Sequence, residues 1–377
     1  MTPRLRDLSE ENGPLARLAR FNYGLAFLLC CVAGIGAASL YSAAGGALDP
    51  WASRHLARFG FALTVLLVVA LIDVRRWYDF SYILYGIGLV LLLMVEIIGQ
   101  VGMGAQRWID LGFMRLQPSE LMKIAVVMAL ARYYQGVPAE DAARLKTLVI
   151  PVVIVLLPVG LVLLQPDLGT SLMIVMAAAA VIFVAGAPVW LYLAGIISAV
   201  AAVPVAWQFL HDYQKQRVLT FLDPSRDPLG AGYHITQSKI AIGSGGIEGK
   251  GFLEGTQSRL NFLPEKQTDF IFTLWVEETG LIGGIIMILL LGAIMAYGYY
   301  ICFQCKHIYG RLLVFGLTTN FALYAFINIS MVMGLIPVVG APLPLVSYGG
   351  TAMLAAMISF GLICSTSGSR EIRLGKM

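Results

Sequence analysis

Long apolar segments recur along the whole chain and are separated by polar connections. A helix that crosses a membrane needs about 20 mostly apolar residues. Segments of this kind lie near residues 22–42, 57–73, 81–101, 119–134, 148–165, 168–187, 189–208, 270–300, 311–335 and 349–367. The pattern predicts an all-α fold, a polytopic membrane bundle of about ten transmembrane helices. The first segment is interpreted as a helix and not as a signal peptide, because it is long and further spans follow it.

The composition agrees with this pattern. The chain is 58% hydrophobic and 13% charged, whereas a soluble domain has about 25% charged residues. Its apolar surface must therefore lie in something other than a single core, and lipid is the expected solvent. The net charge of +4 is small and scattered, so no nucleic-acid partner is expected. Residues 1–377 are predicted to form a single integral membrane domain.

The positive charges of the short connections predict the orientation, since cytoplasmic loops are rich in Lys and Arg. One side carries Arg4, Arg6, Arg17, Arg20, Arg75, Arg76, Arg132, Arg144, Lys146, Lys306, Arg311, Arg370, Arg373 and Lys376. The short loops of the other side carry Arg54, Arg58, Arg107 and Arg115. Both termini are therefore expected in the cytoplasm. The long loop near 209–268, between the seventh and eighth spans, is expected outside.

Polar residues collect at the predicted outer ends of the spans. Pro118 and Glu120 are typical of a helix start. Lys123 follows three residues after Glu120, on the same helical face, so the two can pair. A structural ion pair and a direct substrate role are both compatible with this spacing. The next external turn carries Gln165 and Asp167. Asp167 is either the N-cap of the sixth span or a polar group that faces the same external cavity.

The long loop and the start of the last span add further candidates. The run ITQSKIAIGSGG predicts a short amphipathic helix that ends at glycines. The loop's positive charges suit phosphate or anionic lipid, although a solvated loop would also carry them; they are Lys239, Lys250, Arg259 and Lys266. The run PVVGAPLPLVSYGGTAM, which contains Ser347, predicts irregular backbone that lines a cavity or is buried in protein. Cys302, Cys305 and His307 lie close together after the eighth span, but a structural zinc site needs four ligands and no second group of ligands is visible. We therefore interpret these cysteines as membrane-embedded thiols.

Four long motifs together resemble one family of membrane proteins. They are QRWIDLG with QPSELMK; QPDLGTS; GYHITQSKIAIGSGG with GTQSRLNFLPEKQTDFIF; and PLPLVSYGGT. These runs are similar to those of the SEDS family (shape, elongation, division, sporulation) over essentially the whole chain. The resemblance implies a peptidoglycan glycosyltransferase that polymerises lipid II at the outer face of the bacterial cytoplasmic (inner) membrane. The short tails and the run ending in TDFIF favour the branch that maintains rod shape during elongation over the division branch.

The family's TDF motif falls on Thr268, Asp269 and Phe270, and the resemblance implies that Asp269 is essential for polymerisation. Sugar transfer needs a base that takes the proton of the acceptor hydroxyl, and partial burial could raise the pKa of Asp269 and make it a better base. Asp269 is therefore hypothesised to be the general base or a metal-organising carboxylate. The alternative is that Thr268 and Asp269 simply cap the eighth helix.

The pyrophosphate leaving group needs stabilisation by cationic side chains or by a divalent cation such as Mg²⁺ or Mn²⁺. The candidate side chains are Arg107, Lys123, Lys239 and Lys266. Gln165, Asp167, Glu120 and Ser347 are the candidate supporting residues. No organic cofactor is expected.

Two other functions compete with an enzyme. A lipid II flippase would also have many spans and buried charge, but no inverted repeat is visible and the polar clusters lie on one side. A scaffold without chemistry would not explain the grouping of Asp269 with Glu120, Lys123 and Arg107. The family resemblance also implies partners, namely a class B penicillin-binding protein that acts as transpeptidase, the elongation machinery and membrane lipid.

Overall fold

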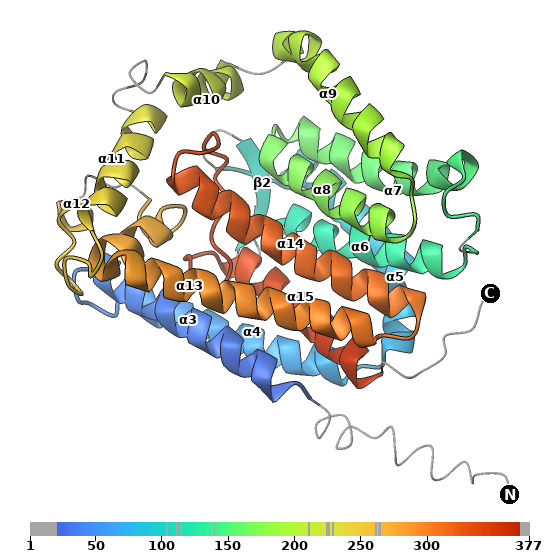
Figure 1. The fold of residues 1–377 in the computed structure, drawn as a ribbon, viewed down its shortest axis with the longest axis horizontal. Helices are drawn as coiled ribbons and strands as arrows, with labels where there is room; N and C mark the ends of the chain where they lie inside the picture. The colour runs from blue at the N-terminus through green and yellow to red at the C-terminus, as the bar shows by residue number, and fades with distance from the viewer. Residues whose placement is uncertain are drawn as a thin grey trace, which may run out of the picture.

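The computed structural model describes residues 21–102, 105–110, 112, 115–138, 140–209, 212–223, 227, 230–260, 262 and 265–369. Ten helices lie over the ten predicted segments within these ranges (Figure 1). They are α3 (Tyr23–Ala43), α4 (Ala52–Leu71), α5 (Val74–Ile98), α6 (Pro118–Gln135), α7 (Leu145–Leu164), α8 (Leu168–Val184), α9 (Val189–Phe209), α13 (Ile271–Gln304), α14 (Ile308–Val332) and α15 (Gly350–Gly368). The predicted helical bundle is confirmed.

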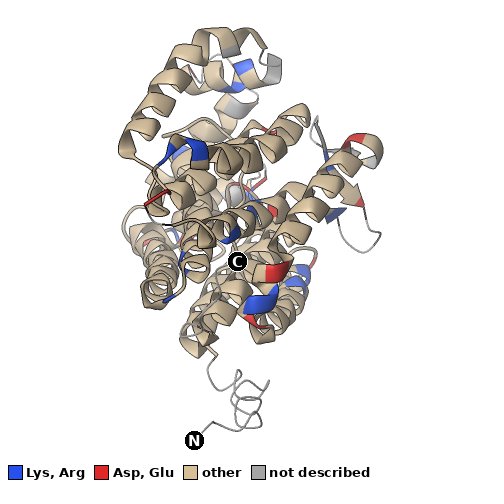
Figure 2. Ribbon diagram, turned by 90° about the vertical axis from the view of Figure 1, so that its right-hand side faces the viewer, with Lys and Arg blue, Asp and Glu red and all other residues tan. Residues whose placement is uncertain are grey.

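Most of these helices expose apolar side chains, as lipid-facing helices do. Seven helices of the described ranges are long and apolar enough to cross a membrane, namely α3, α4, α5, α7, α13, α14 and α15. Large apolar side chains such as Leu156 of α7, Ile197 of α9 and Leu289 of α13 are exposed. Because exposed apolar area on this scale is unfavourable in water, the protein is an integral membrane protein. Charged residues are sparse along its helices (Figure 2).

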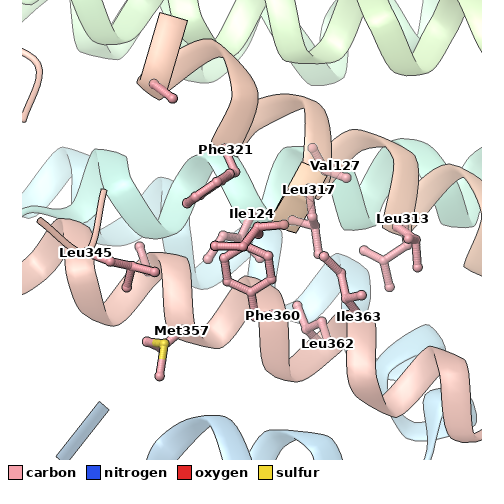
Figure 3. Packing of buried hydrophobic residues seen from close by; sticks show 14 of the residues in the cluster. Ile124, Val127, Leu313, Leu317, Phe321, Leu345, Met357, Phe360, Leu362 and Ile363 are labelled. Atoms are coloured by element: carbon pink, nitrogen blue, oxygen red, sulfur yellow. The ribbon is translucent and has the colours of Figure 1, made fainter. Parts of the chain in front are cut away.

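The centre of the bundle is formed by α6, α14 and α15. Helix α6 buries residues on all of its faces, from Pro118 to Gln135, because α5, α8 and α14 pack around it. Phe321 of α14 meets Phe360 of α15 edge to face, with ring centroids 5.0 Å apart. Figure 3 shows this aromatic pair beside Ile124 of α6 and Leu317 of α14. This core gives the polar residues of α6 and α14 a rigid support.

A small antiparallel sheet follows α5 and was not predicted. Its strands are β1 (Gln100–Gly102), β2 (Ala105–Asp110) and β3 (Arg115–Leu116), in the order β1-β2-β3. The expected span over 81–101 ends earlier, at Ile98. The helix stops there because Gly99 is extended and glycine recurs in the following residues, at 102 and 104, which disfavours a helix.

Within its described residues, the predicted long loop contains three helices, α10 (Asp212–Leu222), α11 (Ala231–Ser244) and α12 (Thr256–Arg259). In Figure 1 they lead from the end of α9 to the start of α13. The short helix predicted from ITQSKIAIGSGG is confirmed as part of α11, which ends at Ser244. Its C-cap is Gly245, and Gly246 follows with a φ of 58°. Left-handed backbone of this kind favours glycine.

Helix α13 is kinked at Gly280, where φ is 67° and ψ is −165°. The loop before α12 satisfies the backbone groups around this kink. Lys250 N donates to the Glu277 carbonyl (3.1 Å), and Gly251 N donates to the Glu278 carbonyl (3.0 Å). On the other side of the kink, Leu281 N donates to the Gly246 carbonyl (3.0 Å). The head of α13 before the kink is therefore bound to the loop segment 246–251.

Replacing Gly280 with Ala should weaken this junction. A Cβ at Gly280 would collide with the backbone of Ile247 and Gly249, and the left-handed φ disfavours any other residue. We expect a loss of about 1–3 kcal/mol in the free energy of unfolding, measured as a lower Tm in detergent. Gly292→Ala in the same helix is the control, since its Cβ would meet nothing within 4 Å. Equal Tm values for the two variants would contradict the role of the kink.

Candidate active site

Asp269 lies in a turn, residues 265–270, directly before α13. Its side chain faces the segment before α15, because a Cβ built on Gly340 would be 3.5 Å from Asp269 Oδ2. Burial, together with the negative charge of Glu265, raises the pKa of Asp269 to about 6, although the charge of Arg217 opposes this shift. A carboxylate with this pKa can accept a proton near neutral pH.

The capping alternative for Asp269 is wrong. Helix α13 begins at Ile271, its N-cap is Phe270, and no side chain caps it. Thr268 instead donates its hydroxyl hydrogen within the turn, to Glu265 Oε2 (3.0 Å). Thr268 and Asp269 therefore both lie before the N-cap of the helix.

Three consecutive carbonyls of this turn each accept a hydrogen bond from outside it. Tyr348 N donates to the Gln267 carbonyl (2.8 Å). Ser347 Oγ donates to the Thr268 carbonyl (2.6 Å), and Asn328 Nδ2 of α14 donates to the Asp269 carbonyl (2.9 Å). We call these three donors the carbonyl clamp. Ser347, a predicted supporting residue, thus lies beside Asp269, whereas Asn328 was missed by the sequence reasoning.

Glu120 and Lys123 form the ion pair expected from their spacing. Lys123 Nζ lies 2.8 Å from Glu120 Oε1, and α6 begins at Pro118 as predicted. The hydroxyl of Tyr324 of α14 contacts both side chains. A cavity between α6, α14 and α15 reaches this group and is lined by Glu120, Asn320, Tyr324 and Ser359 among apolar side chains.

Arg107, Gln165 and Asp167 meet at the turn between α7 and α8. Asp167 caps α8 as expected, because Thr170 N donates to its Oδ1 (3.1 Å). Arg107 of β2 donates to the Pro166 carbonyl (2.6 Å) and has its Nε 3.6 Å from Asp167 Oδ2. Gln165 Nε2 donates to the Leu92 carbonyl (3.0 Å). These contacts attach the small sheet to the helices, and the charge of Lys123 also acts on Asp167.

The long loop supplies one cation that acts on Asp269 and two further candidate cations. Arg217 of α10 interacts with the charge of Asp269 and donates from Nη1 to the Val339 carbonyl (3.4 Å). Lys266 is partly buried in the same turn as Asp269, and burial lowers the pKa of its ammonium. Lys239 of α11 is exposed and extends over Gly334. Arg217 was not predicted, since its segment gives no helical or motif signal of its own.

One predicted cation and two unassigned carboxylates take structural partners. Lys250 Nζ lies 2.8 Å from Glu277 Oε1, a fully buried group. The same oxygen accepts from Gln257 N (2.8 Å). Glu278 accepts a hydrogen bond from the hydroxyl of Ser42 of α3. Lys250 therefore holds the loop against α13, and Arg259 is exposed at the end of α12.

Helix α14 connects the two polar groups of the site. Tyr324 contacts the pair on α6, and Asn328 contacts the turn of Asp269. These two residues are four apart and therefore share one face of α14. The arrangement combines a carboxylate of raised pKa with nearby cations, which suits proton abstraction beside an anionic leaving group.

The fold and this site define a polytopic membrane protein with a carboxylate-centred polar site next to the head of α13. The chain matches the FtsW/RodA/SpoVE family, described as cell cycle protein, over residues 21–372. It therefore belongs to this family, and the resemblance given by the four motifs is confirmed.

Relatives and solved structures agree with this assignment. Peptidoglycan glycosyltransferase MrdB of Escherichia coli (strain K12) is 44% identical over 320 residues, which cover 85% of this chain and 86% of MrdB. One similar structure is a chain from a peptidoglycan synthase complex, in a study of the structural coordination of polymerization and crosslinking. It has a TM-score of 0.82 and 32% sequence identity, and the match covers 93% of this chain and 98% of that chain. RodA, the rod shape determining protein of Thermus thermophilus, has a TM-score of 0.72 and 28% sequence identity. This match covers 94% of this chain and 98% of the RodA chain. The expected similarity to the rod-shape branch is confirmed.

Proposed function

We propose that this protein is a peptidoglycan glycosyltransferase that polymerises lipid II into glycan strands during cell elongation. The observation that carries the proposal is Asp269, a partly buried carboxylate whose pKa is raised to about 6 beside the head of a membrane helix. The similarity to MrdB and RodA supports the same reaction. A lipid-linked sugar would present its head group at this level while its tail stays in the bilayer.

The reaction needs a base and a stabilised leaving group. The Asp269 carboxylate takes the proton of the acceptor hydroxyl as that oxygen attacks the anomeric carbon of the donor. The new glycosidic bond forms while the bond to the undecaprenyl pyrophosphate breaks, and the pyrophosphate leaves with the electron pair. Arg217, whose charge acts on Asp269, is the cation best placed to stabilise it, and Lys266 of the same turn is a second candidate.

The other predicted cations serve this step less directly. Lys123 is only 1% exposed and is engaged by Glu120 and Tyr324. Arg107 is bound to carbonyls of the α7–α8 turn. Lys239 is exposed on α11 and is a candidate for the more distant phosphate or for anionic lipid. Gln165 and Asp167 support the site because they pack in the turn between α7 and α8.

The residues present fit a divalent cation only in part. No group of three or more His, Cys, Asp or Glu side chains in the described ranges could hold a metal ion. Mg²⁺ needs only one or two carboxylates when substrate phosphates supply further ligands, and Asp269 with Glu265 matches that requirement. A bound Mg²⁺ or Mn²⁺ would neutralise charge on the pyrophosphate.

We also propose an orientation and partners. The positive charges of the short connections support cytoplasmic termini and a site that faces the outside of the inner membrane. The similarity to a chain of a peptidoglycan synthase complex supports a class B penicillin-binding protein as the crosslinking partner. Other proteins of the elongation machinery are expected to assemble on this pair.

The function is tested with purified protein, purified lipid II and the cognate transpeptidase, with a drug that blocks crosslinking. Glycan ladders that depend on the protein would support the proposal. Liposomes that carry lipid II in one leaflet test the flippase alternative in parallel. Transfer of lipid II across the bilayer without any ladder would overturn the glycosyltransferase assignment and favour transport.

The rate of polymerisation should depend on pH through Asp269. The base must be ionised, so activity should be present above the pKa of about 6 and lost as the pH falls through it. Below the midpoint the rate should fall about tenfold per pH unit. Glu265→Gln removes a negative charge that raises this pKa, so the midpoint should move to lower pH.

The matched control for this pH profile is Glu254→Gln, which removes another exposed carboxylate of the same loop. Its midpoint should stay at the wild-type value. The rate is measured as initial glycan synthesis at saturating lipid II between about pH 5 and 8, a range that extends at least about one pH unit on each side of the expected midpoint. A rate that does not change over this range would contradict the base assignment.

A further inference from the structure

Asn328 is a buried amide in the apolar helix α14 that bonds to two segments outside its own helix. Its side chain is fully buried. Nδ2 donates to the Asp269 carbonyl (2.9 Å) and to the Ala341 carbonyl (2.7 Å). Because both neighbours are acceptors, the nitrogen of the amide must face them, and both of its hydrogens are used. Asn328 thus joins α14, the turn of Asp269 and the segment before α15.

The turn that carries Asp269 has unusual backbone that needs outside support. Glu265, its first residue, has a φ of 54°, a left-handed conformation that is strained for a residue other than glycine. Leu345, in the segment that faces the turn, also has a positive φ, of 65°. Within the turn, Thr268 N donates back to the Glu265 carbonyl (3.0 Å). The carbonyl clamp supplies the remaining support.

The bonds of the carbonyl clamp differ in what they fix. Ser347 Oγ also accepts from Leu343 N (2.8 Å), so it closes its own segment as well as holding Thr268. Asn328 acts on the carbonyl of Asp269 itself, which is bonded to the Cα that carries the carboxylate. A rotation of this peptide group would swing the Cα–Cβ bond and displace the carboxylate.

We propose that Asn328 is a positioning residue that fixes the direction of the Asp269 carboxylate toward the acceptor hydroxyl. This inference rests on the proposed function of Asp269. Catalysis is sensitive to misplacement of a reacting group by about 1 Å, which can cost 10²-fold in rate. A site held by a helix is better fixed than one held by a loop alone, and α14 is also the helix whose Tyr324 contacts the Glu120–Lys123 pair.

Asn328→Leu tests the proposal, because leucine keeps the volume and removes both donors. We expect kcat to fall about 10–100-fold with KM for lipid II within about twofold of wild type. We also expect the acid midpoint of the rate to move down, toward the ordinary value of a carboxylate, because a released Asp269 would be better solvated. The groups whose charges act on Asp269 in the wild type are Glu265 and Arg217.

A merely structural role for Asn328 would give a different result. A partly misfolded preparation loses active molecules, so the binding stoichiometry of lipid II would fall with kcat and the midpoint would not move. Thr318→Val is the matched control, since it removes another buried polar group of α14 far from the turn; it should keep the wild-type kcat and midpoint.

If Asn328→Leu does not fold, Ser347→Ala gives the second test, because it removes a single bond of the carbonyl clamp. It should shift kcat and the midpoint in the same direction, by a smaller amount. Wild-type kcat and midpoint in Asn328→Leu, or a loss of kcat that follows the binding stoichiometry alone, would overturn the proposal. Wild-type activity in Asp269→Asn would instead overturn the role of Asp269, on which this inference rests.

Discussion

Asp269→Asn is expected to lower glycan synthesis by about 10²–10⁴-fold, the range that loss of a general base produces. Asparagine keeps the size of the side chain but cannot take a proton from the acceptor hydroxyl near neutral pH. The fold should survive, because Asp269 caps no helix and the carbonyl clamp binds its backbone and not its side chain. The measurement is the initial rate of ladder formation with lipid II and the partner transpeptidase.

Two further expected results show whether the loss of glycan synthesis comes from the missing base. Binding of lipid II by Asp269→Asn should remain, because the tail and pyrophosphate contacts do not involve the proton transfer. Glu254→Gln, which changes an exposed carboxylate of the neighbouring loop, should polymerise like wild type. A ladder of normal intensity from Asp269→Asn would remove the base from the mechanism.

Lys123→Met and Glu120→Gln should each destabilise the protein strongly. The two side chains are almost fully buried and 2.8 Å apart. Loss of one partner leaves the other charge buried without compensation, which costs about 3–5 kcal/mol in the free energy of unfolding. The double variant should recover most of this loss, since a neutral pair of similar size is often tolerated. Thermal unfolding of the four proteins in detergent gives the comparison.

An exposed pair with the same spacing is the control. Arg144 and Asp141 are also three residues apart, with Arg144 Nη1 2.9 Å from Asp141 Oδ1, but their side chains are 71% and 36% exposed. Asp141→Asn should therefore cost only about 0–1 kcal/mol. If the single variants at 120 and 123 instead melt like wild type but make no glycan, the pair serves the substrate directly and not the fold.

The sequence was most informative where a feature depends on neighbouring residues. Runs of about 20 apolar residues were enough to locate the ten long helices of the described residues. A segment that crosses lipid must satisfy its own backbone hydrogen bonds, so such a run forms a helix. The start of α6 at Pro118 and the cap of α8 by Asp167 were also predictable, since the bonded groups lie within four residues of each other. The ion pair of α6 followed from the same local spacing.

Features that depend on distant contacts were missed. Asn328 is a single amide in an apolar helix, and its role becomes visible only when a turn 59 residues earlier folds against it. The kink at Gly280 depends on loop residues 246–251, and glycine is common enough in membrane helices to give no signal. The capping alternative for Thr268 and Asp269 was wrong because α13 begins only at Ile271, and the carbonyls of the turn before it bind Ser347 and Tyr348, far along the chain.

The break at Gly280 divides α13 into two parts with different surroundings. Beyond it, the longer part exposes Leu281, Ile285 and Leu289, as a lipid-facing helix does. Before it, the head is tied to loop 246–251 by backbone bonds and by Lys250. The same loop is also bonded beyond the break, where Leu281 N donates to the Gly246 carbonyl. Helices adjust their tilt to bilayers of different thickness, and because the loop bonds to both sides of Gly280, the two parts of α13 would tilt together. The reaction centre would then move with α13 as one unit when the lipid composition of the cell envelope changes.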